Sequence, residues 1–186
     1  MLLITLGLLL WAGVHFIPSA AIPLKQKWSE RLGPNGYQGS FALLIVLSIV
    51  LIVIGWRSTV PEVLYVLPPF TRHLAMLIML IAFILMGASH AKTRIKQYVR
   101  HPQLTGVVVW AFGHLLANGD SRSLLLFGGL GIWALINMQT INKRDGEWVK
   151  PDIPPIGVEL RGLAISLVVY VVVVFLHPWI SGMPLH

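Results

Sequence analysis

The sequence predicts an all-α membrane protein, a polytopic bundle of about six transmembrane helices forming a single domain over residues 1–186. Hydrophobic residues make up 56% of the 186 positions and charged residues only 11%, whereas a soluble domain carries roughly a quarter charged residues. The apolar residues also gather into long runs along nearly the whole chain, which leaves no room for a soluble domain of ordinary size. This composition excludes soluble enzyme folds, and the bilayer is the first partner that we expect.

Six apolar runs are expected to form the membrane helices. They cover residues 1–22, 40–56, 74–90, 104–117, 122–137 and 160–181. Each approaches the ~20 residues that cross a ~30 Å hydrocarbon layer, although the fourth and fifth are short. Between these two, Asn118-Gly119 indicates a helix stop and Asp120 or Ser121 an N-cap, so we expect a tight helical hairpin. The Pro-rich connections 61–69 and 151–155 are expected to be interfacial loops.

Lysine and arginine residues predict the orientation of the chain in the membrane. Eleven of them fall in or beside the first, third and fifth connections, and three fall on the other side. The positive-inside rule then predicts that the eleven lie in the cytoplasm and that both termini lie outside. Because these residues sit in short stretches between apolar runs, we attribute the net charge of +7 to topology and expect no nucleic-acid partner. The eleven are Lys25, Lys27, Arg31, Lys92, Arg94, Lys96, Arg100, Lys143, Arg144, Lys150 and Arg161.

Two histidines are expected deep inside the bilayer. His15 and His114 lie ~10 and ~16 Å from the cytoplasmic ends of their runs at the helical rise of ~1.5 Å per residue, so we expect the first and fourth helices to be adjacent and the two rings to face each other. Both belong to a Trp-Ala-x-x-His pattern, in which Trp11 and Trp110 lie one helical turn before the histidine on the same face. Two imidazoles flanked by indole planes suit a flat apolar macrocycle, and the pair would clamp a non-covalent haem.

Other roles for these histidines stay open at this point. A membrane histidine also serves as a structural hydrogen-bond partner, for which Ser48, Ser166 and Tyr170 are candidates, or as a proton relay. Zinc is not expected, because a two-histidine site lacks the third protein ligand and no acidic residue lies at mid-depth. The chain has no Cys, which excludes disulfides, thiolate metal sites and covalently attached haem.

The densest motif is Arg-His-Pro-Gln-Leu-Thr-Gly at residues 100–106, which continues through Trp110, His114 and Asn118-Gly119-Asp120. Together with Gly-Val-His-Phe at 13–16 and Arg-Leu-Gly at 31–33 followed by Tyr37, it resembles the NnrU family of bacterial membrane proteins over most of the chain. The resemblance implies a multi-pass protein of the bacterial inner membrane, with both termini in the periplasm. The family name implies a context of nitrite and nitric oxide metabolism.

The resemblance extends to the 15-cis-zeta-carotene isomerases of plants and cyanobacteria. These are similar over the Arg-His-Pro-x-x-x-Gly segment and the following Trp-x-x-x-His. They hold haem b through histidines, and the matching positions here are His15 and His114. The isomerases have a Cys one turn before the second ligand, where this chain has Ala111. The resemblance therefore favours haem binding over carotenoid isomerisation.

Three polar residues near the motif have a structural and a functional interpretation. Arg100 anchors the helix to anionic headgroups or pairs with a haem propionate. Asn118 caps the fourth helix or orients a bound group, and Asp120 caps the fifth helix or forms a salt bridge to Arg122. The cofactor residues that we expect are therefore Trp11, Trp110, Arg100 and Asn118, with His15 and His114 as iron ligands.

The expected function is that of a haem-b-binding membrane protein of the NnrU type with a redox or sensing role. The first alternative is a haem-dependent carotenoid cis-trans isomerase or redox enzyme acting on a lipid-soluble substrate. The second comes from the similarity of Arg100-His101-Pro102 to isoprenylcysteine and phospholipid methyltransferases, which use S-adenosylmethionine. Here the stretch 142–147, Asn-Lys-Arg-Asp-Gly-Glu, lacks the acidic pair that those enzymes place near an Arg.

Overall fold

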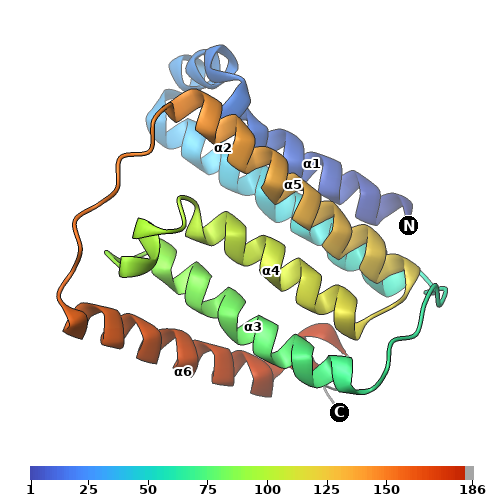
Figure 1. The fold of residues 1–186 in the computed structure, drawn as a ribbon. Coiled ribbons are helices and arrows are strands. Elements are labelled where there is room, and N and C mark those ends of the chain that lie inside the picture. The colour runs from blue at the N-terminus through green and yellow to red at the C-terminus, as the bar shows by residue number, and fades with distance from the viewer. Residues whose placement is uncertain (183–186) are drawn as a thin grey trace.

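The computed structural model describes residues 1–182, and within them the chain forms six α-helices, which confirms the all-α prediction (Figure 1). Five of these helices are long and apolar enough to cross a membrane, and the 16-residue α4 is apolar but shorter. The helices are α1 (Leu2–Ala20), α2 (Ile22–Ser58), α3 (Phe70–Ser89), α4 (Pro102–Ala117), α5 (Ser121–Asp145) and α6 (Ile156–Ser181), and a short 3₁₀ helix, η1, covers Arg94–Gln97.

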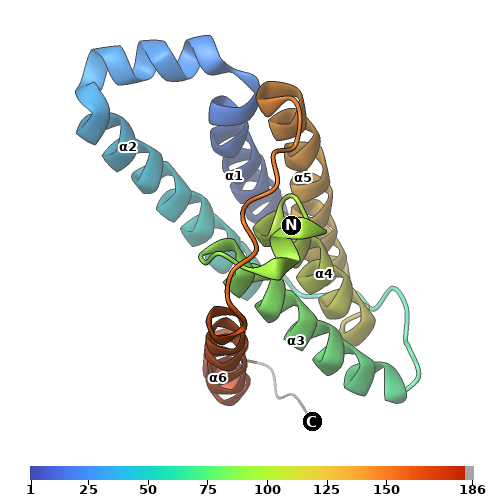
Figure 2. The ribbon, with the colours of Figure 1, turned by 60° about the vertical axis from the view of Figure 1, so that its left-hand side comes forward.

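The first connection is helical, which the sequence did not predict. Residues 22–32 form the first part of α2, and the helix then bends at Gly33, whose backbone has φ 71° and ψ 168°. Pro23 and Pro34 each stand at the start of a helical part, the position that proline tolerates best. Figure 2 shows this first part lying across one end of the bundle before α2 turns back along α1.

Helix α5 lies at the centre of the packing. It packs against both α1 and α4, while α2 packs on α1, and α3 packs on α4 and carries α6 on its other side (Figure 1). The expectation that the first and fourth helices are neighbours is therefore wrong, because α5 separates them. Its glycines explain the position: Gly129 faces Leu8 of α1, and Gly131 faces Ala111 of α4. Small residues let helix backbones approach closely in a membrane.

The six helices alternate in direction, so the N-terminus and the end of α6 lie at the same end of the bundle (Figure 1). The connections around residues 21–33, 90–101 and 146–155 lie at the other end, which we call the basic end because the eleven lysines and arginines lie in or beside them. The end with the N-terminus and the connections 59–69 and 118–120 is called the opposite end.

The expected hairpin between α4 and α5 is present. Asp120 is the N-cap of α5 and accepts hydrogen bonds from the backbone N–H groups of Arg122 and Ser123, at 3.0 and 3.1 Å. It also forms a salt bridge with Arg122, at 3.7 Å, so it has both of the structural roles considered for it. The side chain of Arg122 also donates a hydrogen bond to the carbonyl of Trp56, at 2.9 Å, which connects the end of α2 to the start of α5.

Candidate functional site

Both membrane histidines have the same hydrogen-bonded geometry. His15 Nδ1 lies 2.8 Å from the carbonyl oxygen of Trp11, and His114 Nδ1 lies 3.0 Å from that of Trp110. A carbonyl oxygen only accepts, so in the neutral ring the proton is on Nδ1 and the lone pair is on Nε2. This is how proteins orient histidines that bind a metal through Nε2. Each tryptophan lies on the same helix face as its histidine, as the pattern predicts.

His15 is enclosed by aromatic rings from three helices. Its ring centroid is 4.4 Å from that of Trp11 on α1, 5.0 Å from Trp133 on α5 and 5.6 Å from Phe41 on α2. The indole Nε1 atoms of Trp11 and Trp133 are buried and have no hydrogen-bond partner. Unsatisfied buried donors are rare in proteins, and here two of them flank one imidazole.

The bend in α2 extends this aromatic cluster to the basic end. Because Gly33 reverses the direction of the chain, Trp28 contacts Tyr37, with ring centroids 5.0 Å apart. Tyr37 in turn contacts Phe41 at 6.0 Å. The Arg-Leu-Gly segment and Tyr37, singled out in the sequence, thus shape the side of the bundle that faces His15.

His114 lies in a second cluster. Its ring stacks on Phe127 of α5, with centroids 4.2 Å apart and an interplanar angle of 24°, and it contacts Trp110 at 4.6 Å. The third neighbour is His177 of α6, whose ring centroid is 6.4 Å from that of His114. His177 was not among the histidines that the sequence singled out. No local pattern marks it, because its proximity to His114 arises from the packing of both α4 and α6 on α3.

The two clusters are separate, contrary to the expectation that His15 and His114 face each other. His15 contacts Trp133 and His114 contacts Phe127, and these positions are six residues apart on α5, or ~9 Å along the helix axis. His15 is five residues from the basic end of α1, whereas His114 is three residues from the opposite end of α4. The two imidazoles therefore lie in different halves of the bundle.

The three side chains considered as structural partners of these histidines bond elsewhere. Each donates its hydroxyl to a backbone carbonyl rather than to an imidazole. The pairs are Ser48 with Ile45, Ser166 with Gly162, and Tyr170 with Met76.

Asn118 and Arg100 lie at opposite ends of α4. Asn118 donates from Nδ2 to the carbonyl of His114 at 3.0 Å, so it caps α4. Arg100 precedes α4, and Pro102, the first residue of that helix, is twelve residues from His114, or ~18 Å along the axis. Arg100 therefore lies at the basic end, at the other end of α4 from His114.

Arg100 instead lines a cavity at the basic end, between η1, the start of α4 and the end of α5. The cavity has a volume of about 370 Å³, which falls in the range of ligand pockets. Within it the Asp145 carboxylate pairs with Arg144, at 2.6 Å, and His101 Nε2 lies 2.9 Å from Asn142 Oδ1. Its lining residues are Lys96, Arg100, His101, Ile141, Asp145, Glu147, Trp148, Val149 and Pro151.

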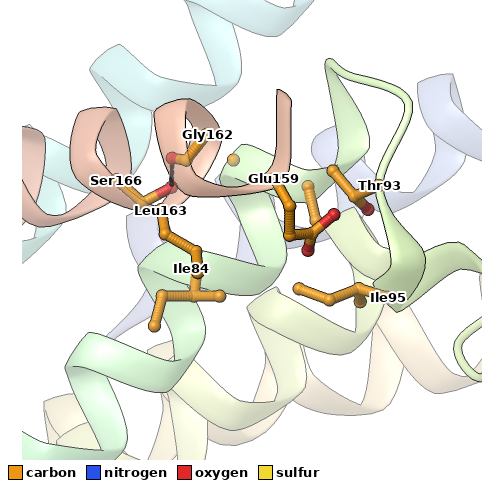
Figure 3. Close-up of a pocket in the computed structure, with 9 residues that line it drawn as sticks. Ile84, Thr93, Ile95, Glu159, Gly162, Leu163 and Ser166 are labelled. Carbon is orange, nitrogen blue, oxygen red and sulfur yellow. Dashed lines mark hydrogen bonds between the residues drawn. The ribbon is translucent and has the colours of Figure 1, made fainter. Parts of the chain in front are cut away.

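A crevice between α3, α6 and the 90–101 segment is too small to hold a ligand (Figure 3). Its volume is about 10 Å³, which is roughly the minimum for one water molecule. Glu159 reaches across it and accepts a hydrogen bond from the backbone N–H of Arg94, at 2.8 Å. This contact joins α6 to the segment that precedes α4.

The ligand chemistry of the membrane region fits a haem better than a metal ion held by the protein alone. Over residues 1–182, no three His, Asp or Glu side chains converge as a metal site would need. A haem needs only one or two axial ligands from the protein, because the porphyrin supplies the other four. His114, with a free Nε2 and a stacked Phe127, meets that requirement, whereas His15 is not placed to share its iron.

Six apolar helices, with α5 packed between α1 and α4 and with half-buried imidazoles held between aromatic rings, define a polytopic helical membrane protein with a histidine site between its helices. The chain belongs to the NnrU family: the family model described as NnrU protein matches residues 3–185, nearly the whole length. No curated protein and no solved structure matches the chain.

Proposed function

We propose that this chain is a haem-b-binding integral membrane protein with a redox or sensing role in nitrite or nitric oxide metabolism. One observation carries the proposal. The hydrogen bond from His114 Nδ1 to the carbonyl of Trp110 leaves the Nε2 lone pair free inside an aromatic cluster. Such an imidazole has the protonation state and the fixed orientation of an iron ligand. The metabolic context rests on membership of the NnrU family.

In this proposal the residues of the chain bind and orient the cofactor. His114 would hold the iron through its imidazole, and Trp110 and Phe127 form apolar walls that hold its ring. When bound, the haem supplies one-electron chemistry or a binding position for a diatomic ligand. Ala111 is buried beside Gly131, so the chain presents no thiol one turn before His114 for ligand exchange of the isomerase kind.

Purification tests the proposal. The full chain, expressed in haem-replete cells and purified in detergent, should carry a haem Soret band and one haem per chain in a pyridine haemochrome assay. His114→Ala should lose most of this haem, whereas His73→Ala, which changes an exposed histidine at the same end of the bundle, should retain it. A colourless wild-type protein, or full haem loading of His114→Ala, would contradict the proposal.

A second candidate function is supported by the cavity at the basic end. A pocket of about 370 Å³ lies directly at the Arg100-His101-Pro102 motif, with Trp148 and Glu147 also in its lining. Because this motif is similar to one in S-adenosylmethionine-dependent methyltransferases, the pocket would be the site for that cofactor in this second candidate function. Binding of S-adenosylmethionine by the purified chain, weakened by Arg100→Gln and unaffected by His114→Ala, would favour this function. The absence of binding at millimolar concentration would exclude it.

A further inference from the structure

We propose that His177, and not His15, is the second axial ligand of the haem iron. This inference rests on the proposed function, since it identifies the partner of His114 at the same site. It assigns a role to the C-terminal helix α6, whose other contacts are with α3 and with Arg94. Two observations carry it: the depth of the histidines and the separation of their rings.

Depth favours His177 over His15. His114 is three residues before the end of α4 and His177 is four residues before the end of α6, and both helices end at the opposite end of the bundle (Figure 1). The two rings therefore lie within one helical turn of the same level. His15 is in the other half, in contact with a position of α5 ~9 Å further along that helix. Two axial ligands of one iron must lie at opposite sides of the same atom.

The separation of the rings also fits one iron. The centroids of His114 and His177 are 6.4 Å apart. Two imidazoles on opposite sides of a metal have centroids roughly 6 Å apart, because each metal–nitrogen bond is about 2 Å and each ring extends the distance by about 1 Å. The pair therefore already has the spacing of bis-imidazole ligation, and no helix has to move along its axis to reach that spacing.

His177 is also held by a contact at Nδ1. The Ser181 oxygen lies 3.2 Å from His177 Nδ1, and the Ser181 hydroxyl lies within 2.9 Å of the carbonyl oxygen of His177. In His114 the same ring nitrogen, Nδ1, is hydrogen-bonded within its own helix.

The test compares two single variants of the full-length, haem-loaded protein in detergent. Wild type should show the absorption and low-temperature EPR spectra of six-coordinate, low-spin haem. His177→Ala should keep the haem but convert it to a high-spin form, and added imidazole should restore the low-spin spectrum. His15→Ala is the matched control, since it removes the other buried imidazole, and its spectra should equal those of wild type. Rescue by imidazole also shows that His177→Ala is folded.

Each contrary result has a distinct meaning. If His177→Ala stays low-spin while His15→Ala becomes high-spin, the assignment is wrong and haem binding stands. If wild type itself is high-spin and unchanged in His177→Ala, His114 is the sole ligand and the inference is again overturned. If purified wild type holds no haem at all, the proposed function fails, and the inference fails with it.

Discussion

At the scale of single residues, the hydroxyl of Tyr65 satisfies the end of a helix that is distant in sequence. It donates to the carbonyls of Leu115 and Asn118, at 2.7 and 3.1 Å, while its backbone N–H donates to the carbonyl of Gly119 at 3.1 Å. The connection 59–69 therefore closes the α4–α5 hairpin just beyond His114. Unpaired carbonyls at a helix end are costly near a membrane, where few water molecules replace the missing donor.

The pKa of Tyr65 gives a prediction of pH dependence. Burial first, and then the negative charge of Asp120, raise the pKa of this phenol above 10.0. In the unfolded chain the phenol ionises near 10 while in the folded chain it stays protonated, so its contribution to stability is complete below pH 10 and is lost as the pH rises towards the folded pKa. Unfolding of wild type and Tyr65→Phe in detergent, followed at pH 8 and pH 11, checks this.

Tyr65→Phe should be less stable than wild type by about 1–3 kcal/mol at pH 8, because two carbonyls lose a donor. The difference should shrink at pH 11, where only wild type has this phenol to ionise. Tyr98→Phe is the control, since Tyr98 is 84% exposed and should behave as wild type at pH 8. A stability difference between wild type and Tyr65→Phe that grows with pH would contradict the argument.

Gly119 lies against the same segment and predicts a second effect. A Cβ built on Gly119 would collide with the backbone carbonyl oxygen of Tyr65. A backbone atom cannot move aside as the end of a flexible side chain can. Gly119→Ala should therefore cost about 1–3 kcal/mol, the usual range for overpacking, as measured by thermal unfolding in detergent. Gly162→Ala, where a Cβ meets no atom within 4 Å in α6, should leave the melting temperature unchanged or slightly raised. Equal effects of the two substitutions would refute the steric argument.

At the scale of elements, the bend in α2 depends on one glycine. The φ of 71° and ψ of 168° at Gly33 lie in a region open essentially to glycine alone, where other residues are strained by about 1–3 kcal/mol. Gly33→Ala should lower stability by that amount or straighten the bend, and weaken the contact between Trp28 and Tyr37. Unfolding and tryptophan fluorescence measure both effects. Gly39→Ala, six residues later with open space around it, should change neither.

The sequence predicted those features that depend on neighbouring residues. Asp120 was recognised as an N-cap and Trp110 as a same-face neighbour of His114, because capping and helical spacing are local rules. The first part of α2 was missed, since its polar composition gives no apolar run and the bend depends on the backbone of Gly33. The expected adjacency of the first and fourth helices was wrong, because it depends on tertiary packing: α5 lies between them, with glycines at its contacts with α1 and α4.

At the scale of the whole molecule, the orientation in the membrane is open to a direct test, because the chain contains no Cys. We expect the basic end to face the cytoplasm. Val66→Cys, on the connection 59–69, should react with a membrane-impermeant maleimide in intact spheroplasts. Val149→Cys, at the basic end, should react only after permeabilisation. The two sites are 85% and 87% exposed, so a difference in reactivity reports sidedness, and the reverse pattern would invert the topology.

The central position of α5 has a consequence for how the protein is assembled in the cell. The pair α1–α2 and the pair α3–α4 each form before α5 is synthesised, and their contacts with each other run through α5. The two hairpins can therefore pack into one body only after the ribosome has completed α5, about 145 residues into the chain. Until then the connection 59–69 is the covalent link that holds them near each other.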